Sequence, residues 1–167
     1  MDISFEPVSS EHLSPLADIF NYYVEHSVSL FITEPVSNEE MRAMLFFEDS
    51  RYAAFAIIAN EKLAGFISIH SHNQRAAYRD TADITLYLAP EYTGIGLGSR
   101  AVEFIEKYAE KNGFHVLLAS IAGGNTASVR LFEKMDYVKA AHFKELGYKH
   151  GQWLDVVWYE KILRKET

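Results

Sequence analysis

The sequence contains no cysteine. Disulfide bonds, thiolate zinc sites and a cysteine nucleophile are therefore excluded. No stretch approaches the roughly 20 apolar residues that a membrane-spanning helix needs. The first residues also lack the basic start and apolar run of a secretory signal. These absences lead us to expect a cytoplasmic protein without a membrane partner.

Basic residues are in the minority, with 16 Lys and Arg against 23 Asp and Glu and a formal net charge of −7. This balance argues against nucleic acid as a partner, because such binding relies on basic contacts to phosphates. A small local basic pocket remains compatible with it. The four prolines do not mark a domain boundary, and no repeat or linker is present. We therefore expect a single domain that spans residues 1–167.

Hydrophobic periodicity predicts the element order β-α-α-β-β-β-α-β-α-β-β. The expected strands are residues 3–7, two strands within 52–72 joined by a turn at 60–62, residues 82–90, residues 114–122, and two closing strands around residues 147–151. The strand at 114–122 is a continuous apolar run, which indicates cover on both faces. This order is typical of an α/β fold (an α+β mixed sheet with helices packed on it).

The expected helices follow four residues that can begin them: Ser10, Ser37, Gly98 and Asn125. Ser10 is the expected N-cap of the first helix. Ser37 and Glu40 have the spacing of a capping box for the second.

The stretch "TGIGLGS", residues 93–99, has three glycines in five residues between an apolar strand and a helix. Glycines let the backbone approach a phosphate closely, and the first amides of a helix have no internal partner. A P-loop would need a Lys after Gly98, and a dinucleotide-binding fold would need the spacing G-x-G-x-x-G near a first strand. The diphosphate of coenzyme A and a purely structural turn remain as interpretations.

The same stretch resembles the coenzyme A loop, Q/R-x-x-G-x-G/A, of the GCN5-related N-acetyltransferase (GNAT) superfamily, with Thr93 at the first position. The segment "GGNTASVRLFEKMDY" is similar to a second GNAT signature. That resemblance covers nearly the whole chain and implies the GNAT fold and acetyl-CoA as co-substrate. It also places Phe132 where many members have a Tyr that protonates the leaving thiolate, and Asp136 where Gly is usual.

A narrower resemblance is to the phosphinothricin and methionine sulfoximine N-acetyltransferases. It rests on "NYYVEHSVSLFITEPVS", "RAAYRDTADITLYLAP", "GLGS" and "GYKHGQWLDVVWYEK". Proteins of this branch form dimers, so the resemblance also implies a homodimer.

The resemblance implies three sets of site residues. The catalytic residues are Asp83, at the position of a proton-accepting Glu, and Leu88, whose backbone N–H polarises the thioester carbonyl. The cofactor-binding residues are Leu86, Tyr87, Leu88, Gly94, Ile95, Gly96, Leu97, Gly98, Ser99, Asn125 and Ser128. The substrate-binding residues are Phe31, Arg75, Tyr78 and Asp83. No metal site is expected, because His70 and His72 alternate on a strand without a third ligand at suitable spacing.

The sequence therefore predicts an acetyl-CoA-dependent N-acetyltransferase that acts on the α-amine of a small amino-acid-like acceptor such as phosphinothricin or methionine sulfoximine. Without a cysteine, direct attack in a ternary complex is the simplest route. Two alternatives remain open. The acceptor is a different small amine or amino acid, or the protein is a non-catalytic sensor that binds acyl-CoA.

Overall fold

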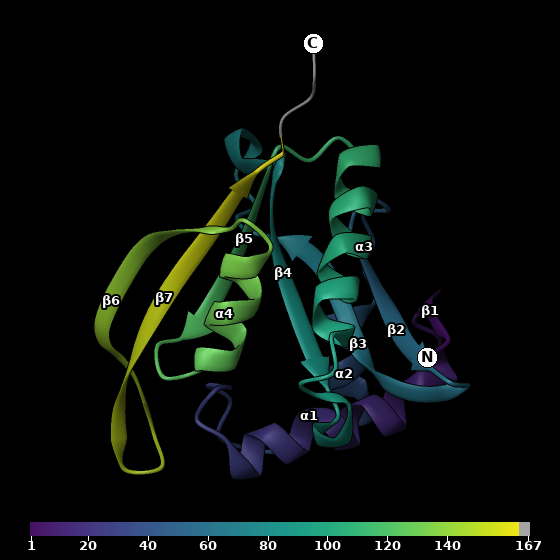
Figure 1. The fold of residues 1–167 in the computed structure, drawn as a ribbon, viewed down its shortest axis with the longest axis horizontal. Coiled ribbons are helices and arrows are strands. Elements are labelled where there is room, and N and C mark those ends of the chain that lie inside the picture. The colour runs from purple at the N-terminus through teal and green to yellow at the C-terminus, as the bar shows by residue number, and fades with distance from the viewer. Residues whose placement is uncertain (164–167) are drawn as a thin grey trace.

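A computed structural model describes residues 1–163 as one seven-stranded sheet with helices on both faces (Figure 1). The strand order is β1-β2-β3-β4-β5-β7-β6. The strands are β1 (Ile3–Pro7), β2 (Ala53–Ala59), β3 (Lys62–Ser71), β4 (Thr81–Leu88), β5 (Val116–Ala122), β6 (Val138–Lys149) and β7 (Gln152–Ile162). The helices are α1 (Leu13–His26), α2 (Asn38–Leu45), α3 (Leu97–Lys111) and α4 (Thr126–Lys134), with 3₁₀ turns η1 (Ser10–His12), η2 (Ala76–Tyr78) and η3 (Pro90–Tyr92). The predicted element order and the mixed α/β fold class are confirmed.

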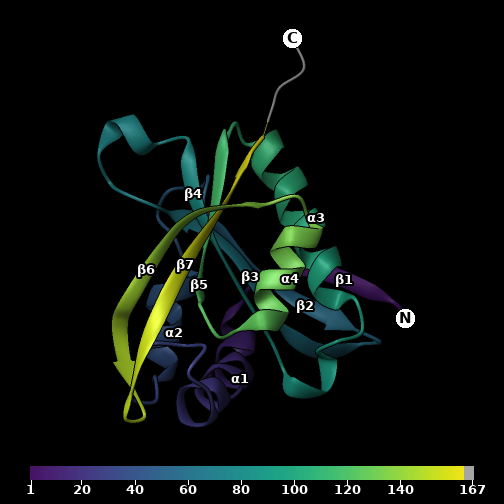
Figure 2. The ribbon, with the colours of Figure 1, turned by 60° about the vertical axis from the view of Figure 1, so that its left-hand side comes forward.

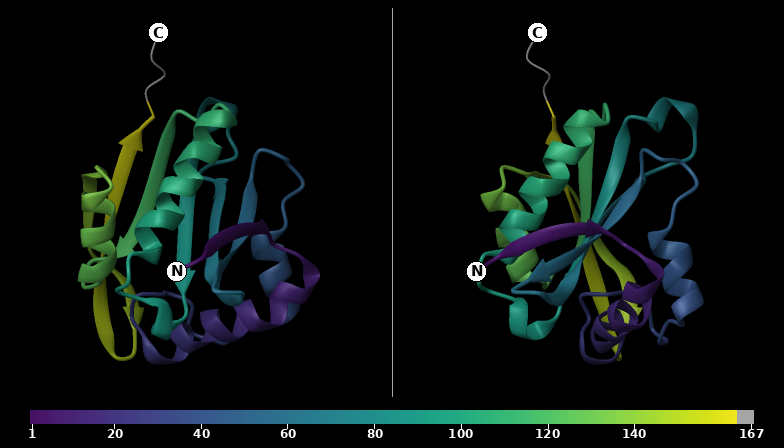
Figure 3. Two further views of the ribbon diagram at one scale, coloured as in Figure 1. Left: turned by 45° about the vertical axis from the view of Figure 1, so that its right-hand side comes forward. Right: turned by 90° about the vertical axis from the view of Figure 1, so that its right-hand side faces the viewer.

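Two hydrophobic clusters hold the helices to the sheet. The ribbon in Figure 3 shows how these helices are arranged around the sheet. The larger cluster joins α3 and α4 to one face and includes Ile84 of β4, with Leu86 and Leu88 packed against it. The smaller cluster joins α1 and α2 to the opposite face and includes Phe66 of β3, with Tyr87 packed against it. Because side chains alternate along a strand, odd-numbered residues of β4 face the α1/α2 side. Among residues 1–163, no helix is long and apolar enough to cross a membrane.

Local signals set several of the element ends. Oγ of Ser37 accepts a hydrogen bond from the Glu40 N–H at 3.1 Å, so the predicted cap of α2 is confirmed. The expected turn at 60–62 is a tight hairpin in which Asn60 and Glu61 have φ of 47° and 66°. The prediction that Ser10 caps the first helix is wrong. Ser9 is the N-cap of η1, and α1 begins at Leu13.

Two strand predictions need correction. The run at 114–122 is not covered on both faces: Ser120 is exposed, and Val116 and Leu118 are half-buried. These side chains lie on the α1/α2 face, which no helix covers beside β5 (Figure 3). The closing turn is also narrower than predicted, because β6 continues to Lys149 and the turn consists of His150 and Gly151.

The sheet divides between its two parallel strands. Residues 81–83 of β4 pair with residues 116–118 of β5, and the pairing ends there. Beyond this point β4 stays with β3 while β5 stays with β7. The two strands diverge toward the lower edge of Figure 1, and the sheet is open between them.

Candidate active site

The glycine loop presents backbone N–H groups at the start of α3. Gly96 is the N-cap of α3 with φ of 85°, and Gly94 has φ of 73°. This left-handed backbone is accessible to glycine at little cost. Within the described chain, the N–H groups of residues 94–99 donate no hydrogen bond. They therefore form a concentrated donor site at the positive end of the helix dipole.

The backbone of Leu88 faces the opening in the sheet. The N–H of Ala89 bonds to the carbonyl of Ala64 in β3 at 2.8 Å. Polar groups of successive residues in an antiparallel strand point to opposite sides, so those of Leu88 point away from β3. Accordingly, the Leu88 carbonyl accepts a hydrogen bond from the hydroxyl of Tyr23 at 2.6 Å. The Leu88 N–H is thus directed toward the space between β4 and β5.

A cleft of about 730 Å³ fills this opening. On one side it is lined by residues of the glycine loop and of α4, such as Gly96 and Ser128. On the other side it is lined by Tyr22, Tyr23 and Ser29, which belong to α1 and the loop after it. The cleft is therefore bounded by elements from both faces of the sheet.

The mouth of the cleft carries positive charge. Arg130 and Lys134 lie four residues apart on α4, are exposed, and line the cleft together with the glycine loop. At the start of α4, Oδ1 of Asn125 accepts the N–H of Ser128 at 3.2 Å. A chain of free amides beside two cations fits a diphosphate, so these residues suit the binding of coenzyme A.

A polar cluster lies on the α1/α2 face next to the cleft. Nδ1 of His72 is 2.8 Å from Oδ1 of Asp83. The imidazole of His72 also makes edge contacts with Tyr78, at 5.9 Å between ring centroids, and with Trp158 of β7, at 5.8 Å. Tyr78 comes from the loop between β3 and β4, which projects from the sheet in Figure 2. These contacts fix the orientation of the His72 ring.

Burial raises the pKa of Asp83 above its ordinary value, while the charge of His72, its hydrogen bond and the charge of His70 lower it. Nε2 of His70 is in turn 2.9 Å from Oγ1 of Thr85, and Thr85 lines the cleft. A partly desolvated carboxylate beside imidazoles is a common feature of sites that accept protons.

The family follows from comparison with known proteins. Residues 16–137 match the model of the acetyltransferase (GNAT) family. This chain belongs to the GNAT family. It is 30% identical over 166 residues to the phosphinothricin N-acetyltransferase of Streptomyces coelicolor, with 97% of each chain covered. It is 24% identical over 148 residues to the L-methionine sulfoximine/L-methionine sulfone acetyltransferase of Salmonella typhimurium, with 87% of this chain and 85% of the relative covered.

The fold agrees with that of solved GNAT structures. A phosphinothricin acetyltransferase from Sinorhizobium meliloti, solved in complex with acetyl-CoA, superposes with a TM-score of 0.92 at 23% identity. The match covers 98% of this chain and 89% of the other. The predicted family, fold and enzyme class, an N-acetyltransferase, are therefore confirmed.

The residues predicted to bind the cofactor converge on the cleft of this GNAT protein, with two exceptions. Those that line it are Leu86, Tyr87, Leu88, Gly94, Gly96, Gly98, Ser99, Asn125 and Ser128. Ile95 is 51% exposed and Leu97 is buried in the core at 1%. These two contribute only their backbone at the loop.

The residues predicted to bind the acceptor are more dispersed, and none of them lines the cleft itself. Tyr78 and Asp83 are brought together through His72. Arg75 is exposed and precedes η2, where its N–H donates to Asn73. Phe31 packs on β6, where a Cβ on Gly147 would lie 2.6 Å from its ring. Phe31 therefore packs against the β6–β7 hairpin.

Several residues of the site were not predicted from the sequence. Tyr22 and Tyr23 line the cleft from α1, and Arg130 lines it from α4. Tyr23 follows the apolar stripe of α1, and nothing in that stripe distinguishes a core tyrosine from one at a cleft. The i, i+4 spacing of Arg130 and Lys134 was the available signal for a basic pocket.

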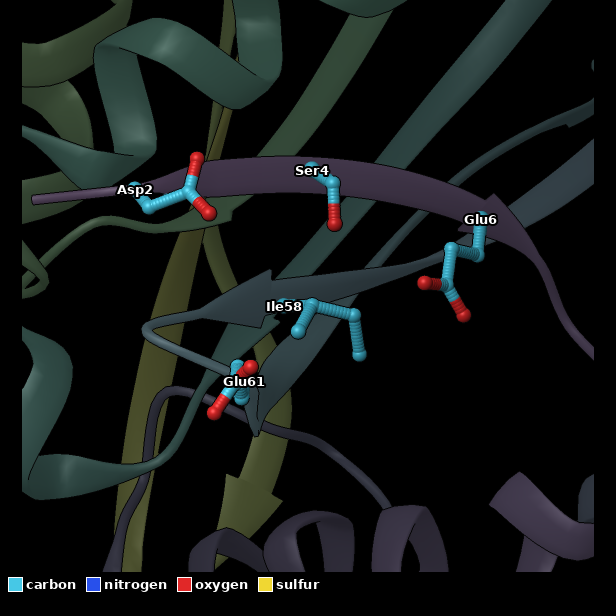
Figure 4. Close-up of a pocket in the computed structure, with 5 residues that line it drawn as sticks. All are labelled: Asp2, Ser4, Glu6, Ile58 and Glu61. Carbon is cyan, nitrogen blue, oxygen red and sulfur yellow. The ribbon is translucent and has the colours of Figure 1, made fainter.

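A second hollow, of about 330 Å³, lies at the β1 edge of the sheet (Figure 4). It is lined by Asp2, Ser4, Glu6, Ile58 and Glu61. Within residues 1–163, no three His, Asp or Glu side chains are grouped as a metal site would require. This hollow also lies away from the donor amides and the polar cluster, so we assign it no part in the chemistry.

Proposed function

We propose that this protein transfers the acetyl group of acetyl-CoA to the α-amine of a small amino-acid-like acceptor, by direct attack in a ternary complex. The observation that carries the proposal is the opening between β4 and β5, with its cleft lined from both faces of the sheet. Such an opening lets a thioester from the α3/α4 side meet an amine from the α1/α2 side. Holding the two together supplies up to about 7–11 kcal/mol of the barrier in favourable cases.

On the donor side, the amides of residues 94–99 and the cations Arg130 and Lys134 bind the diphosphate. The amide of Leu88 is the donor to the oxyanion that forms on the thioester carbonyl. This role is supported by the direction of the Leu88 backbone and by the Tyr23 hydroxyl, which holds the adjoining carbonyl. Asn125 and Ser128 contact the pantetheine arm at the start of α4.

On the acceptor side, Asp83 provides the carboxylate that removes a proton from the ammonium, because an α-amine is mostly protonated at neutral pH. Tyr78 is held near it through His72. Arg75 directly precedes η2 and pairs with the acceptor's own acid group, for which its planar fork is suited. Phe31 provides an apolar contact from the opposite side.

The relatives favour an acceptor such as phosphinothricin or methionine sulfoximine. An amine panel with acetyl-CoA, followed by release of the coenzyme A thiol, tests this choice. We expect turnover of both compounds, with little turnover of polyamines. If both compounds are inert while another amine reacts, the proposed acceptor is wrong and the proposed acetyltransferase activity is retained. If acetyl-CoA binds but no amine reacts, the protein is an acyl-CoA-binding sensor.

The glycine loop can be tested with a matched pair of substitutions. Gly96 and Gly113 have φ of 85° and 80°, and neither position has any atom within 4 Å of an added Cβ. Alanine therefore adds the same left-handed strain, about 1–2 kcal/mol, at both ends of α3. We expect Gly96→Ala to weaken acetyl-CoA binding about 10-fold by calorimetry, and Gly113→Ala to leave it unchanged. Equal affinities of the two variants for acetyl-CoA would show that the glycine loop is not part of the binding site.

We further propose that the whole chain, residues 1–167, is one catalytic domain that works as a homodimer in the cytoplasm. The β6–β7 hairpin exposes large apolar side chains, among them Leu146 at 61%, Tyr148 at 58% and Trp153 at 63%. Exposed apolar patches of this kind favour association. Light scattering should give a dimer for the wild type and a monomer for Trp153→Glu. Since the chain has no cysteine, its fold does not depend on an oxidising compartment.

A further inference from the structure

Four polar side chains form a row on the α1/α2 face, from the cleft to the outer end of β3. In order they are Thr85, His70, Asp83 and His72. Thr85 lines the cleft, and its Oγ1 is 2.9 Å from Nε2 of His70. At the outer end, Nδ1 of His72 is 2.8 Å from Oδ1 of Asp83, and the His72 side chain is 28% exposed. The row thus joins the cleft to solvent.

The register of β3 and β4 places the two hydrogen-bonded pairs side by side. His70 is the direct cross-strand partner of Asp83, yet its Nε2 contacts Thr85, two residues closer to the cleft. Side chains directly opposite in an antiparallel pair have Cβ atoms about 4.5–5.5 Å apart. His70 therefore lies beside both groups: its Nε2 contacts the Thr85 hydroxyl at the cleft, and Asp83 is its cross-strand neighbour.

The row contains a carboxylate that is partly withdrawn from water. The Asp83 side chain is 19% exposed, so its charge is only partly screened by water. Among the elements packed against the row, η2 presents the titratable side chain of Tyr78 and β7 presents the indole of Trp158. Burying polar groups costs free energy unless they are paired. In this row each group is paired with another group that can exchange protons.

We propose that this row removes the proton from the acceptor amine and conducts it to solvent, with His70 as its first acceptor through the Thr85 hydroxyl. The inference rests on the proposed acetyl transfer and places Thr85 and His70 between the acceptor amine and the Asp83 carboxylate. The ammonium gives one proton to Oγ1 of Thr85 as that hydroxyl gives its own to Nε2 of His70. The proton then passes to Asp83 and leaves through His72.

The remaining steps balance the transfer. The amine nitrogen forms a bond to the thioester carbonyl carbon, and the carbon–sulfur bond breaks. The second proton of the amine ends on the sulfur of coenzyme A. Each turnover therefore releases one proton to solvent along the row and one thiol from the donor side.

The test compares variants along the row with a control pair elsewhere. His70→Gln and Thr85→Val keep size but cannot transfer the proton, so we expect each to lower kcat/KM for the amine by about 100-fold. His72→Gln should lower it less, because water can replace the outermost group. His142 forms a pair of the same 2.8 Å length with Asp155 on the hairpin. His142→Gln should leave kcat/KM unchanged.

Two further readouts separate proton transfer from a structural effect. The pH profile of kcat/KM in the wild type should contain the ionisation of an imidazole, and His70→Gln should lose it. The activity of His70→Ala should be restored in part by added imidazole, while the Kd for acetyl-CoA stays at the wild-type value in all variants.

Activity within threefold of the wild type in both His70→Gln and Thr85→Val would overturn the inference and leave acetyl transfer intact. Absence of turnover in the wild type with every amine would instead overturn the proposed function, and the inference with it.

Discussion

Two histidine–aspartate pairs in this protein have the same length and opposite electrostatic character. His72 and Asp83 lie beside the cleft, His142 and Asp155 lie on the β6–β7 hairpin, and each pair is 2.8 Å long. Burial raises the pKa of Asp83. A hydrogen bond from the backbone N–H of Glu145, followed by one from His142, lowers the pKa of Asp155.

The surroundings account for this contrast. The side chains of His72 and Asp83 are 28% and 19% exposed, against 40% and 38% for His142 and Asp155. Asp155 also accepts the N–H of Glu145 at 2.9 Å, where β6 departs from regular pairing and Glu145 has φ of 53°. Asp155 stabilises an irregular part of β6, whereas Asp83 is a partly buried carboxylate. Desolvation, and not the length of the contact, distinguishes them.

The largest expected difference between the pairs is in activity. Asp83→Asn should lower kcat/KM for the amine by at least about 100-fold, since it removes a group that accepts protons. Asp155→Asn should leave kcat/KM within about twofold. Thiol release measures both. Similar losses in the two variants would mean that Asp83 acts only as a structural residue.

The two aspartates should also affect stability with opposite sign. The raised pKa of Asp83 gives a contribution that is present below its ordinary pKa and lost as pH rises through the raised value. The lowered pKa of Asp155 gives a contribution that is present above its ordinary pKa and lost as pH falls through the lowered value. At neutral pH, Asp83→Asn should therefore raise the Tm and Asp155→Asn should lower it. Thermal unfolding across the acidic to neutral range checks both signs.

A smaller effect is expected from the aromatic residues beside each pair. Trp158 contacts the His72 ring edge to face, and Trp153 packs against Tyr148 on the hairpin at 4.9 Å. An aromatic pair is worth about 0.5–1.5 kcal/mol, so Trp158→Leu should lower kcat/KM about 2- to 10-fold. Trp153→Leu should leave the kcat/KM of the protein unchanged. A loss in Trp153→Leu alone would show that the hairpin, and not the His72 cluster, controls the acceptor site.

The features that could be predicted from the sequence are those that short-range signals determine. Gly94 and Gly96 have a left-handed backbone that other residues adopt only at a cost, and the Ser37–Glu40 spacing caps a helix by itself. The order of strands and helices follows from apolar periodicity in the same way. The start of α1 was misplaced because two adjacent serines precede it, and the one that caps is selected by His12, whose Nδ1 accepts the N–H of Ser9.

The acceptor site could be predicted only in part, because its contacts depend on strand register. Residues 72–80 separate β3 from β4, and the sequence of such a loop does not fix which residues lie opposite each other. His70 and His72 were correctly predicted to share a face, but their partners Thr85 and Asp83 follow from the pairing of the two strands. The open face beside β5 was missed for a similar reason, because apolar residues alone do not reveal whether a helix covers them.

The early end of the pairing between β4 and β5 has a kinetic consequence. In the reaction that we propose, thioester and amine enter from opposite sides of one sheet, so either can bind first. Double-reciprocal plots of the initial rate should then intersect. Coenzyme A should leave on the side where acetyl-CoA entered, and the acetylated product on the side where the amine entered.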